Sequence, residues 1–386
     1  MSMNFQLSEE QKMIVQAARD FARNQCMPGV IERDEAQRFP REQISQLADL
    51  GFMGLMVSPE YGGAGMDTIS YVLAMEEISK VDASVSVCMS VNNSLVCWGL
   101  EEYGTDEQKA RYLTPLAQGK KDGELYIGAF LLSEPEAGSD ATSQRTIAED
   151  KGDHYILNGT KNWITNGNSA SVYLVMAQTD PAKGPKGIST FIVEKNWPGV
   201  TVGAKENKMG IRASDTHSIL FNDVRVPKEN RIGVEGFGFT FAMKTLAGGR
   251  IGIAAQALGI ASGAYELSVR YAKERKAFGT AIAHHQAIQF KLADMATRIE
   301  AARLLCFKAA WEKDNGQDYT LSSSMAKLYA SEVAMWAATE AVQIHGGYGY
   351  VKEYHVERLM RDAKITQIYE GTSEVQRIVI GRHITK

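Results

Sequence analysis

The chain has 386 residues, 44% of them hydrophobic and 23% charged, and this length predicts two or three domains of an ordinary globular protein. The 42 Lys and Arg residues against 46 Asp and Glu residues give a formal net charge of −4, without a long basic run, so nucleic acid and anionic membranes are not expected partners. No run of about 18 apolar residues is found, so no membrane-spanning helix is expected.

The cysteines and the N-terminal sequence indicate the cellular compartment in which the protein is expected. Cys26, Cys88, Cys97 and Cys306 are scattered and form no CxxC motif, which predicts buried free thiols in a reducing compartment. The N-terminal stretch "MSMNFQLSEEQ" lacks the basic and apolar segments of a signal peptide. We expect a cytoplasmic protein of a bacterium or, if it is a processed organellar protein, one of the mitochondrial matrix.

Residues 1–122 are predicted to form an N-terminal helical domain. Capping boxes begin helices at Ser8 and Thr105, and Asp67 can cap another. The segment "REQISQLADLGFMGL" is a further helix with Gly51 near its end, and "PEYGGAG" is a turn-rich loop.

Residues 123–232 change character and predict a middle β domain. Short runs rich in β-branched and aromatic residues, such as "SVYLVMAQ" and "STFIVEK", are separated by Gly, Asn, Asp and Pro. Because no helix of ten residues lies between them, βαβ units and a parallel sheet are disfavoured. A small antiparallel sheet or barrel is expected.

Residues 233–386 return to helical periodicity. Long segments such as "GGRIGIAAQALGIASGAYELSVRYAKER" are rich in small residues, which allow close helix packing and predict a C-terminal four-helix bundle. The fold class is therefore mixed α and β, mainly α.

Several familiar sources of chemistry are absent from the sequence. No GxGxxG follows a predicted strand, and no P-loop, HExxH motif or GxSxG elbow occurs. The pair His284-His285 heads a helix, where solvated side chains are expected, and no metal site is predicted. The chemistry must come from carboxylates, backbone groups and a bound cofactor.

Two motifs of the middle region have both a structural and a functional interpretation. On residue types alone, "LLSEPEAGSD" (131–140) is a polar turn, but its backbone N–H groups and the hydroxyls of Ser133 and Ser139 could also meet a polar ligand. In "NGTKNWITNG" (158–167), Trp163 is either a core residue or a platform for a flat ring whose edge meets Thr165.

Two motifs of the C-terminal region are similarly open. Arg275 in "ERKAFGTAIAHHQ" (274–286) is either a solvated charge or a phosphate ligand. In "QIHGGYGY" (343–350), helix capping explains one glycine, whereas Gly346-Gly347 together indicate backbone held close to a ligand.

The segment "QIYEGTSEVQR" (367–377) places Glu370 between apolar residues and a helix start. Ser373 and Gln376 have the spacing of a capping box that begins a short helix. Glu370 is either a solvated loop acid or a buried carboxylate, and burial would make it a stronger base.

Each motif is weak alone, but together and in this order they are specific. From residue 5 to residue 383 the chain resembles the acyl-CoA dehydrogenase family of flavoenzymes. Its phrases are most similar to the short-chain, butyryl-CoA branch: "GGRIGIAAQALGIA", "QFKLADMA", "EAVQIHGGYGY" and "RDAKITQIYEGTSEVQR". The resemblance implies the same order of helical, β and helical regions, and a homotetramer that binds FAD.

The resemblance also implies which residues meet ligands. The flavin side of FAD would be held by two segments of the middle region: Phe130, Leu132, Ser133, Gly138, Ser139, Trp163, Ile164 and Thr165. The FAD of a neighbouring subunit would be contacted by C-terminal residues: Arg275, Phe278, Gln286, Gln343, Ile344, Gly346 and Gly347. Thr372 and Glu374 would again meet the cofactor. The acyl-CoA substrate would lie against Ser139, Ala247, Gly248, Gly249, Arg250 and Gly371.

By the same resemblance, Glu370 is the catalytic base. It would remove the Cα proton while FAD accepts the Cβ hydride, leaving a trans-2-enoyl-CoA. Burial behind Ile368 and Tyr369 is expected to raise the carboxylate pKa, and the nearby helix N-terminus opposes that shift. Glu374 is the rival carboxylate, but its place in a first helical turn suits capping better.

Two features near "LAGGRIG" qualify the resemblance. Some branches of the family carry the base there, whereas this chain offers no acid. Relatives usually have an Asp where this chain has Ala247, which puts the detail of CoA binding in doubt, although Arg250 remains.

The electron acceptor and the acyl chain are further expectations. Electrons are expected to pass to an electron-transferring flavoprotein, although an acyl-CoA oxidase or an enoyl-CoA reductase would use the same residues. A non-catalytic scaffold is the alternative outside enzymes. Val87, Met89 and Val91 bring branched or bulky side chains to the region that floors the acyl pocket in relatives, which predicts an optimum at about four to six acyl carbons.

Overall fold

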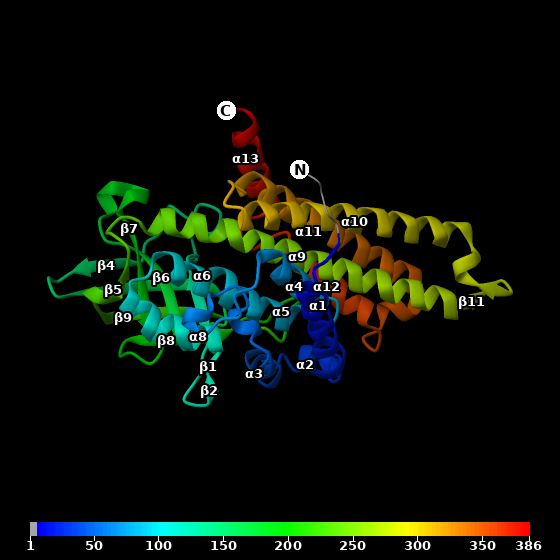
Figure 1. The fold of residues 1–386 in the computed structure, drawn as a ribbon, viewed down its shortest axis with the longest axis horizontal. Coiled ribbons are helices and arrows are strands. Elements are labelled where there is room, and N and C mark those ends of the chain that lie inside the picture. The colour runs from blue at the N-terminus through cyan, green and yellow to red at the C-terminus, as the bar shows by residue number, and fades with distance from the viewer. Residues whose placement is uncertain (1–5) are drawn as a thin grey trace.

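The computed structural model describes residues 6–386, and the first five residues, part of the N-terminal stretch expected to lack a signal peptide, lie outside the described part. Helices come first along the chain, a β-sheet follows, and long helices complete it (Figure 1). The predicted fold class and the order of regions are confirmed. The boundaries after residues 122 and 232 stay a prediction.

The N-terminal region consists of short helices, and its predicted caps are present. The helices are α1 (Glu9–Phe21), α2 (Val30–Glu35), α3 (Arg41–Asp49), α4 (Thr68–Ser79), α5 (Ala83–Ser90), α6 (Trp98–Tyr103), α7 (Asp106–Gln108) and α8 (Thr114–Gln118). Ser8 and Thr105 form complete capping boxes, and the Asp67 side chain accepts a hydrogen bond from the Ser70 N–H. Gly51 has a φ of 77°, which turns the chain just after α3.

The segment Ala83–Tyr103 is one continuous buried helix made of α5, a π-helical run (Val91–Cys97) and α6. Contrary to the sequence expectation, it is long and apolar enough to cross a membrane, but 94% of its apolar window is buried inside the fold. A core helix passes the same test of length and composition. All four cysteines are free and buried, as predicted.

The sheet of the middle region has eight strands in the order β10-β7-β6-β4-β5-β9-β8, with β3 beside β6. The strands are β3 (Gly128–Leu131), β4 (Ile147–Asp150), β5 (His154–Thr165), β6 (Val172–Gln178), β7 (Ile188–Glu194), β8 (Val200–Lys205), β9 (Thr216–Pro227) and β10 (Arg231–Ile232). A short hairpin, β1 (Lys120–Lys121) and β2 (Glu124–Leu125), precedes the sheet.

The prediction of an antiparallel sheet was wrong for one strand. β3 runs parallel to β6, with Gly128 opposite Val172 and Leu131 opposite Val175, and β4 touches β6 in parallel at a single pair. The connection from β3 to β6 contains β4 and β5 in place of a helix, so the absence of a helix did not exclude a parallel pair. Every residue of β6 is buried, and such a strand needs neighbours on both edges.

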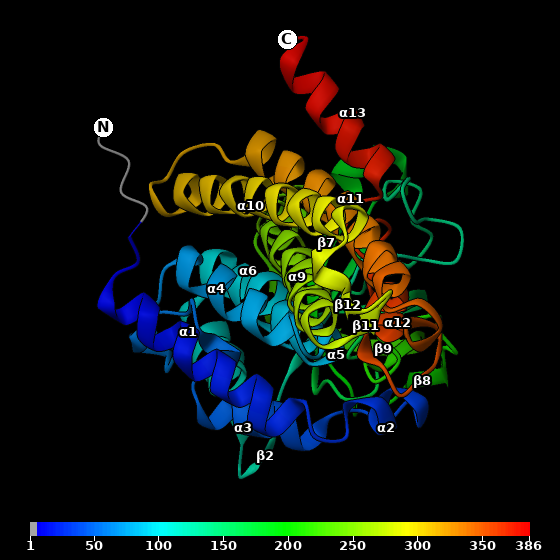
Figure 2. The same cartoon turned by 90° about the vertical axis from the view of Figure 1, so that its right-hand side faces the viewer.

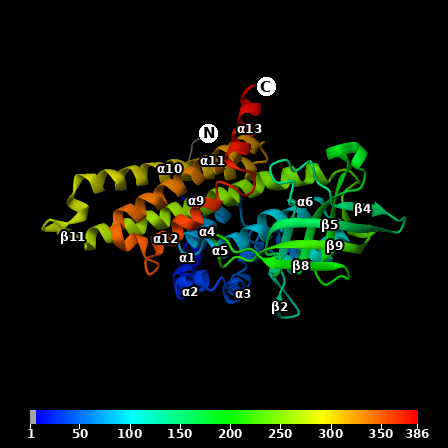
Figure 3. The ribbon, with the colours of Figure 1, turned by 180° about the vertical axis from the view of Figure 1, so that it is seen from behind.

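The C-terminal bundle is formed by α9 (Gly238–Glu274), α10 (Gln286–Asp314), α11 (Thr320–His345) and α12 (His355–Ile365), with α13 (Ser373–Ile384) at the chain end. The 37 residues of α9 span about 55 Å, from the sheet at one end of the molecule to the hairpin β11 (Lys276–Ala277) and β12 (Thr280–Ala281) at the other (Figure 3). The helix α13 projects away from the rest of the molecule (Figure 2).

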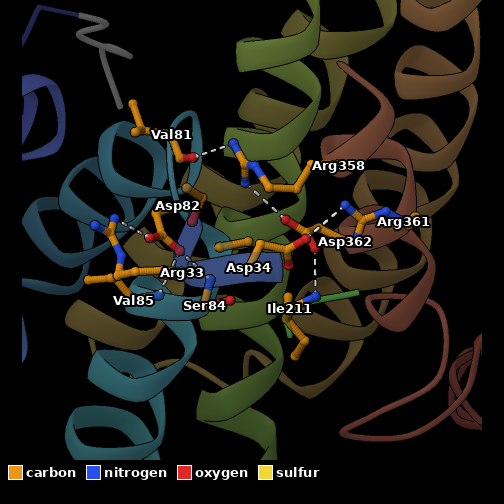
Figure 4. A network of polar contacts seen from close by, with 12 residues as sticks. Arg33, Asp34, Val81, Asp82, Ser84, Val85, Ile211, Arg358, Arg361 and Asp362 are labelled. Carbon is orange, nitrogen blue, oxygen red and sulfur yellow. Dashed lines mark hydrogen bonds and ion pairs between the residues drawn. The ribbon is translucent and has the colours of Figure 1, made fainter. Parts of the chain in front are cut away.

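A network of ion pairs and a backbone hydrogen bond joins the three regions where α2, α12 and the loop before β9 meet (Figure 4). Arg33 pairs with Asp82 at 3.1 Å, Arg361 with Asp34 at 2.8 Å, and Arg358 with Asp362 at 3.1 Å. The Ile211 N–H also donates to Asp362 at 2.5 Å. We call the following residues the inter-region clamp: Arg33, Asp34, Asp82, Ile211, Arg358, Arg361 and Asp362.

Candidate active site

Glu370 lies in the turn between α12 and α13, where the backbone is strained. Its φ is 52°, in the left-handed region, and the next residue, Gly371, has a φ of 92°. For a residue with a side chain this conformation costs about 1–2 kcal/mol. Backbone strain of this kind is concentrated at functional sites, so the observed strain supports a functional role for the turn.

The Glu370 carboxylate points at α9. A Cβ added at Gly249 would lie only 2.2 Å from Glu370 Oε2 and 2.7 Å from Leu95 Cδ2. Only glycine therefore leaves room for the carboxylate at this point of α9. The Oε2 atom is buried and has no hydrogen-bond partner among the residues that the structure describes.

Burial raises the pKa of Glu370 to about 7. The positive charges of Lys327 and Arg250 oppose this shift without cancelling it. Within residues 6–386, no ion pair involves the Glu370 carboxylate. Glu370 is half-buried as a residue while its Oε2 is enclosed, and this environment agrees better with the expected acid of raised pKa than with a solvated loop acid.

The turn is held by two side chains and a helix cap. Lys327 Nζ donates to the Gly371 carbonyl oxygen at 2.7 Å, and Gln376 Nε2 donates to the carbonyl oxygens of Glu370 at 3.2 Å and Gly371 at 2.9 Å. The predicted capping box at Ser373 was wrong by one residue. Thr372 has extended backbone and caps α13, its Oγ1 accepting from the Val375 N–H at 3.3 Å.

Glu374 has a very different environment from Glu370. It is exposed in the first turn of α13, where hydrogen bonds from its own backbone N–H and from Thr372 lower its pKa. A carboxylate of lowered pKa is a weaker base, so this position suits helix capping, as expected.

The other residues expected to bind substrate lie in part around Glu370. Gly371 is part of the Glu370 turn, and Gly249 and Arg250 of α9 lie close to it. Arg250 is only 6% exposed and donates to Ser324 Oγ at 3.3 Å. Ala247 is buried. A Cβ added at Gly248 would instead lie 3.9 Å from both Lys313 Nζ and Tyr319 Oη.

Trp163 is exposed on β5 at a break in strand pairing. Its indole is 60% exposed, its φ is 62°, and the register with β9 shifts between Lys161 and Ile164. The alternative of Trp163 as a core residue was therefore wrong. Ile164, the next residue, is buried, and Thr165 is half-buried.

The loop that follows β3 is anchored beneath by a buried lysine. Lys161 Nζ donates to Glu134 at 2.8 Å, to Gln144 at 3.0 Å and to the Leu132 carbonyl oxygen at 3.1 Å. Phe130 stacks on Phe241 of α9 with ring centroids 6.4 Å apart. The rest of the predicted segment is more open: Ser133 is half-buried, and Gly138 and Ser139 are exposed.

The residues expected to meet a neighbouring subunit's cofactor gather at the far end of α9. Arg275, Ile344, Gly346 and Gly347 line one hollow with a cavity volume of about 550 Å³. Phe278, at the tip of the β11–β12 hairpin, is 97% exposed. Two further residues of this group are exposed at helix ends: Gln286 and Gln343. The pair His284-His285 is solvated only in part, since His285 bonds the Ala277 carbonyl oxygen at 3.1 Å.

Three family models match the chain in order. They describe the acyl-CoA dehydrogenase N-terminal domain over residues 8–120, the middle domain over residues 129–224 and the C-terminal domain over residues 236–385. This chain belongs to the acyl-CoA dehydrogenase family.

Individual members of the acyl-CoA dehydrogenase family match over nearly the full length. The "Acyl-CoA dehydrogenase, short-chain specific" of Clostridium acetobutylicum is 52% identical over 99% of this chain and 100% of its own. The structure of butyryl-CoA dehydrogenase from Megasphaera elsdenii is 49% identical and covers 100% of both chains, with a TM-score of 0.97. A chain in a structure titled for the electron transferring flavoprotein of Acidaminococcus fermentans is 51% identical over 100% of both chains, with a TM-score of 0.97.

Sequence reasoning missed two neighbours of Glu370 in this acyl-CoA dehydrogenase family member. Leu95 packs close to Gly249, where an added Cβ would lie 2.7 Å from its Cδ2. Lys327 Nζ donates a hydrogen bond to the Gly371 carbonyl oxygen. Lys327 could have been recognised from the sequence, because it is a lysine among the small residues on the buried face of α11. A lone lysine on such a face needs a polar partner, and that partner could have been sought.

Proposed function

We propose that this chain catalyses the FAD-dependent α,β-dehydrogenation of short-chain acyl-CoA thioesters to trans-2-enoyl-CoA, with Glu370 as the base. The observation that carries the proposal is the Glu370 carboxylate, whose buried Oε2 has no partner among the described residues. A structural carboxylate buried without a partner is costly, so a reacting proton is the best account of it. The printed names of the similar proteins, short-chain acyl-CoA dehydrogenase and butyryl-CoA dehydrogenase, support the substrate class.

Glu370 has the properties that proton removal from carbon requires. A carboxylate at its ordinary pKa is a weak base, whereas burial raises the pKa of Glu370 to about 7 and so strengthens it. The backbone N–H of Glu370 donates to no acceptor within residues 6–386. It is therefore free to donate to the thioester carbonyl oxygen and to stabilise the negative charge that develops there.

Residues of the middle region and the residue that follows α9 have the chemistry to hold a flavin dinucleotide. The exposed Trp163 offers a flat apolar surface, the open loop at Gly138 and Ser139 offers backbone N–H groups, and Arg275 offers a guanidinium for phosphate. When bound, FAD supplies the hydride acceptor that no side chain can provide. Thr372 and Glu374 remain proposed contacts beside the base.

The separate positions of the expected cofactor residues support a shared cofactor site between two copies of the chain. The strand β5, which carries Trp163, and the β11–β12 hairpin, which follows Arg275, lie toward opposite ends of the molecule (Figure 1). A second copy could bring its own Arg275 beside the first copy's Trp163. The projecting α13 leaves Ile378 and Ile384 exposed, which also favours a partner copy, and we propose a homotetramer.

We further propose that the reduced enzyme passes electrons to an electron-transferring flavoprotein. The support is the match to a chain in a structure titled for such a protein. An acyl-CoA oxidase or an enoyl-CoA reductase would use the same residues and would differ only in electron acceptor or direction. We place the protein in the bacterial cytoplasm or, for a processed organellar protein, in the mitochondrial matrix.

A spectroscopic experiment tests the proposed function. Protein incubated with FAD and desalted should show flavin absorbance bands, and anaerobic addition of butyryl-CoA should bleach them with formation of the trans-2-enoyl thioester. Absence of flavin bands would favour a non-catalytic scaffold. Retained flavin that butyryl-CoA does not bleach would overturn the assigned reaction.

A further inference from the structure

We propose, on the basis of the function proposed above, that Lys327 is a positioning residue for Glu370. Its buried ammonium group fixes the strained Glu370–Gly371 turn and supplies a positive charge beside the reactive carboxylate. Lys327 would act through Glu370 and would not touch the substrate.

The contacts of Lys327 are unusual for a buried lysine. Its side chain is 0% exposed, and its Nζ donates to the Gly371 carbonyl oxygen at 2.7 Å. No ion pair involves Lys327 within residues 6–386. The equally buried Lys161 shows the usual solution, since it pairs with Glu134 at 2.8 Å and also meets Gln144. Burying a cation without a paired carboxylate is costly, so its retention calls for another role.

The hydrogen bond from Lys327 acts on the residue next to the base. Gly371 has a φ of 92° and Glu370 a φ of 52°, so two successive residues are held in the left-handed region. The Gly371 carbonyl oxygen accepts from two helices, through Lys327 of α11 and Gln376 of α13. The two bonds hold the peptide that follows Gly371, and Gln376 also donates to the Glu370 carbonyl oxygen at 3.2 Å, so the turn that positions the carboxylate is fixed.

The charge of Lys327 is also placed to act on the carboxylate. The groups that face Glu370 are Lys327 of α11, Arg250 of α9, Tyr71 of α4 and its neighbour Tyr369. Lys327 in turn faces Glu370, Arg250 and, from α13, Glu374. Burial lowers the pKa of Lys327 to about 8, so the amine is still mostly protonated at pH 7.

The consequence for catalysis follows from the sign of that charge. A cation favours the ionised form of a neighbouring acid, so Lys327 limits how far burial raises the pKa of Glu370. Without the cation, the pKa of Glu370 would rise above its value of about 7, and less of the carboxylate would be ionised at neutral pH. Lys327 thus keeps a desolvated base in its active form.

Three substitutions separate the two roles of Lys327. Lys327→Arg keeps both the charge and the donor, Lys327→Gln keeps a donor without the charge, and Lys327→Met keeps neither. The FAD-loaded proteins would be mixed with butyryl-CoA in single turnover from pH 5 to pH 10, and the rate of flavin bleaching recorded. The exposed Lys352, which pairs with Glu35, provides the control Lys352→Gln.

The pH dependence of the bleaching rate distinguishes the two roles of Lys327. Lys327→Gln and Lys327→Met should shift the acid limb of the rate–pH profile toward higher pH by about one pH unit. Lys327→Arg and Lys352→Gln should keep the acid limb at its wild-type pH. At high pH, Lys327→Gln should recover more of the wild-type rate than Lys327→Met, because only the former can still bond Gly371.

The outcomes that overturn the proposal are distinct from failure of the proposed function. Equal loss of rate at every pH in Lys327→Gln and Lys327→Met, with an unmoved limb, would show a merely structural role. Loss of flavin from all three Lys327 variants would show a role in folding and would equally overturn it. A wild-type protein that butyryl-CoA does not bleach would instead contradict the proposed function itself.

Discussion

The inter-region clamp includes three residues of α12, and the Glu370 turn follows the same helix. The two sites differ in whether their buried charged groups are paired. In the clamp, Asp362 accepts from Arg358 and from the Ile211 N–H, and Arg361 pairs with Asp34 (Figure 4). At the turn, Glu370 Oε2 has no partner among the described residues. Paired buried charges hold the structure together, whereas an unpaired one is available to a ligand.

The pKa values alone would not separate these two acids. Burial raises the pKa of Asp362 to about 6 and that of Glu370 to about 7. The difference lies in the hydrogen bonds, because the Asp362 carboxylate is fully engaged and the Glu370 carboxylate is not. A raised pKa identifies a base only when the geometry leaves the group free to react.

The largest effect is expected from removing the unpaired acid. Glu370→Gln should keep the fold and the flavin but lose turnover with butyryl-CoA by about 100- to 10,000-fold, because the amide cannot accept the proton. Steady-state assays with an artificial electron acceptor measure this. Glu374→Gln, which changes a proposed cofactor contact, should lose far less turnover than Glu370→Gln; the reverse pattern would make Glu374 the base.

The fold of Glu370→Gln can be checked by its stability. The pKa of Glu370 lies above its unfolded value, so the folded state holds the proton more tightly, and stability falls as pH rises from about 4.5 to about 7. At pH 8 the variant should therefore melt no lower than the wild type. A lower melting temperature would point to general damage and not to loss of a base.

Disrupting the inter-region clamp should lower the stability of the fold and not the rate of the reaction. Asp362→Ala leaves Arg358 and the Ile211 N–H buried without their partner, and should lower the free energy of unfolding by about 3–5 kcal/mol. Denaturant titration of the FAD-loaded protein measures the loss. Asp153→Ala, which removes an exposed partner of Arg225, should change stability little. Equal effects of the two substitutions would refute the structural role of the clamp.

A smaller effect on rate is expected from crowding the base without removing it. Gly249→Ala places a Cβ 2.2 Å from Glu370 Oε2 and should lower the bleaching rate by on the order of 100-fold, because the carboxylate must move. Gly381→Ala on α13 adds a Cβ that meets nothing within 4 Å and serves as the control. A wild-type rate in Gly249→Ala would mean that the carboxylate acts from another position.

The smallest and most graded effect concerns the acyl chain. Val87, Met89 and Val91 are all buried, and their role as the floor of the acyl pocket stays a prediction. One methylene of misfit changes transition-state binding by about 1–3 kcal/mol, so kcat/KM should peak at about four to six acyl carbons and fall gradually. A series of straight-chain acyl-CoA thioesters tests this. An optimum at about twelve carbons would remove the short-chain assignment while leaving the dehydrogenation chemistry in place.

Much of the fold could be predicted because its signals are local. The caps at Ser8, Asp67 and Thr105 depend on residues three positions apart, and the long helices on a repeat of 3.6 residues. The parallel pairing of β3 with β6 could not be predicted, since it joins strands separated by about forty residues and by two other strands.

The candidate site was predictable to a similar degree. Glu370 stood out because a carboxylate among apolar residues is uncommon, and the resemblance to a family supplied its role. The helix start at Thr372 was missed by one residue, because a Ser and a Thr at adjacent positions offer the same capping chemistry. The hydrogen bond from Lys327 was missed because α11 meets the turn only in three dimensions.

The pH dependence of single-turnover flavin bleaching by butyryl-CoA tests the central claim most directly. In the wild type, the rate should rise as pH increases through about 7, because the carboxylate of Glu370 is the active form and its pKa is about 7. In Glu370→Gln, the residual rate should be low and should lack that limb. A Glu370→Gln protein that keeps both the wild-type rate and the limb near pH 7 would contradict the assignment of Glu370 as the base.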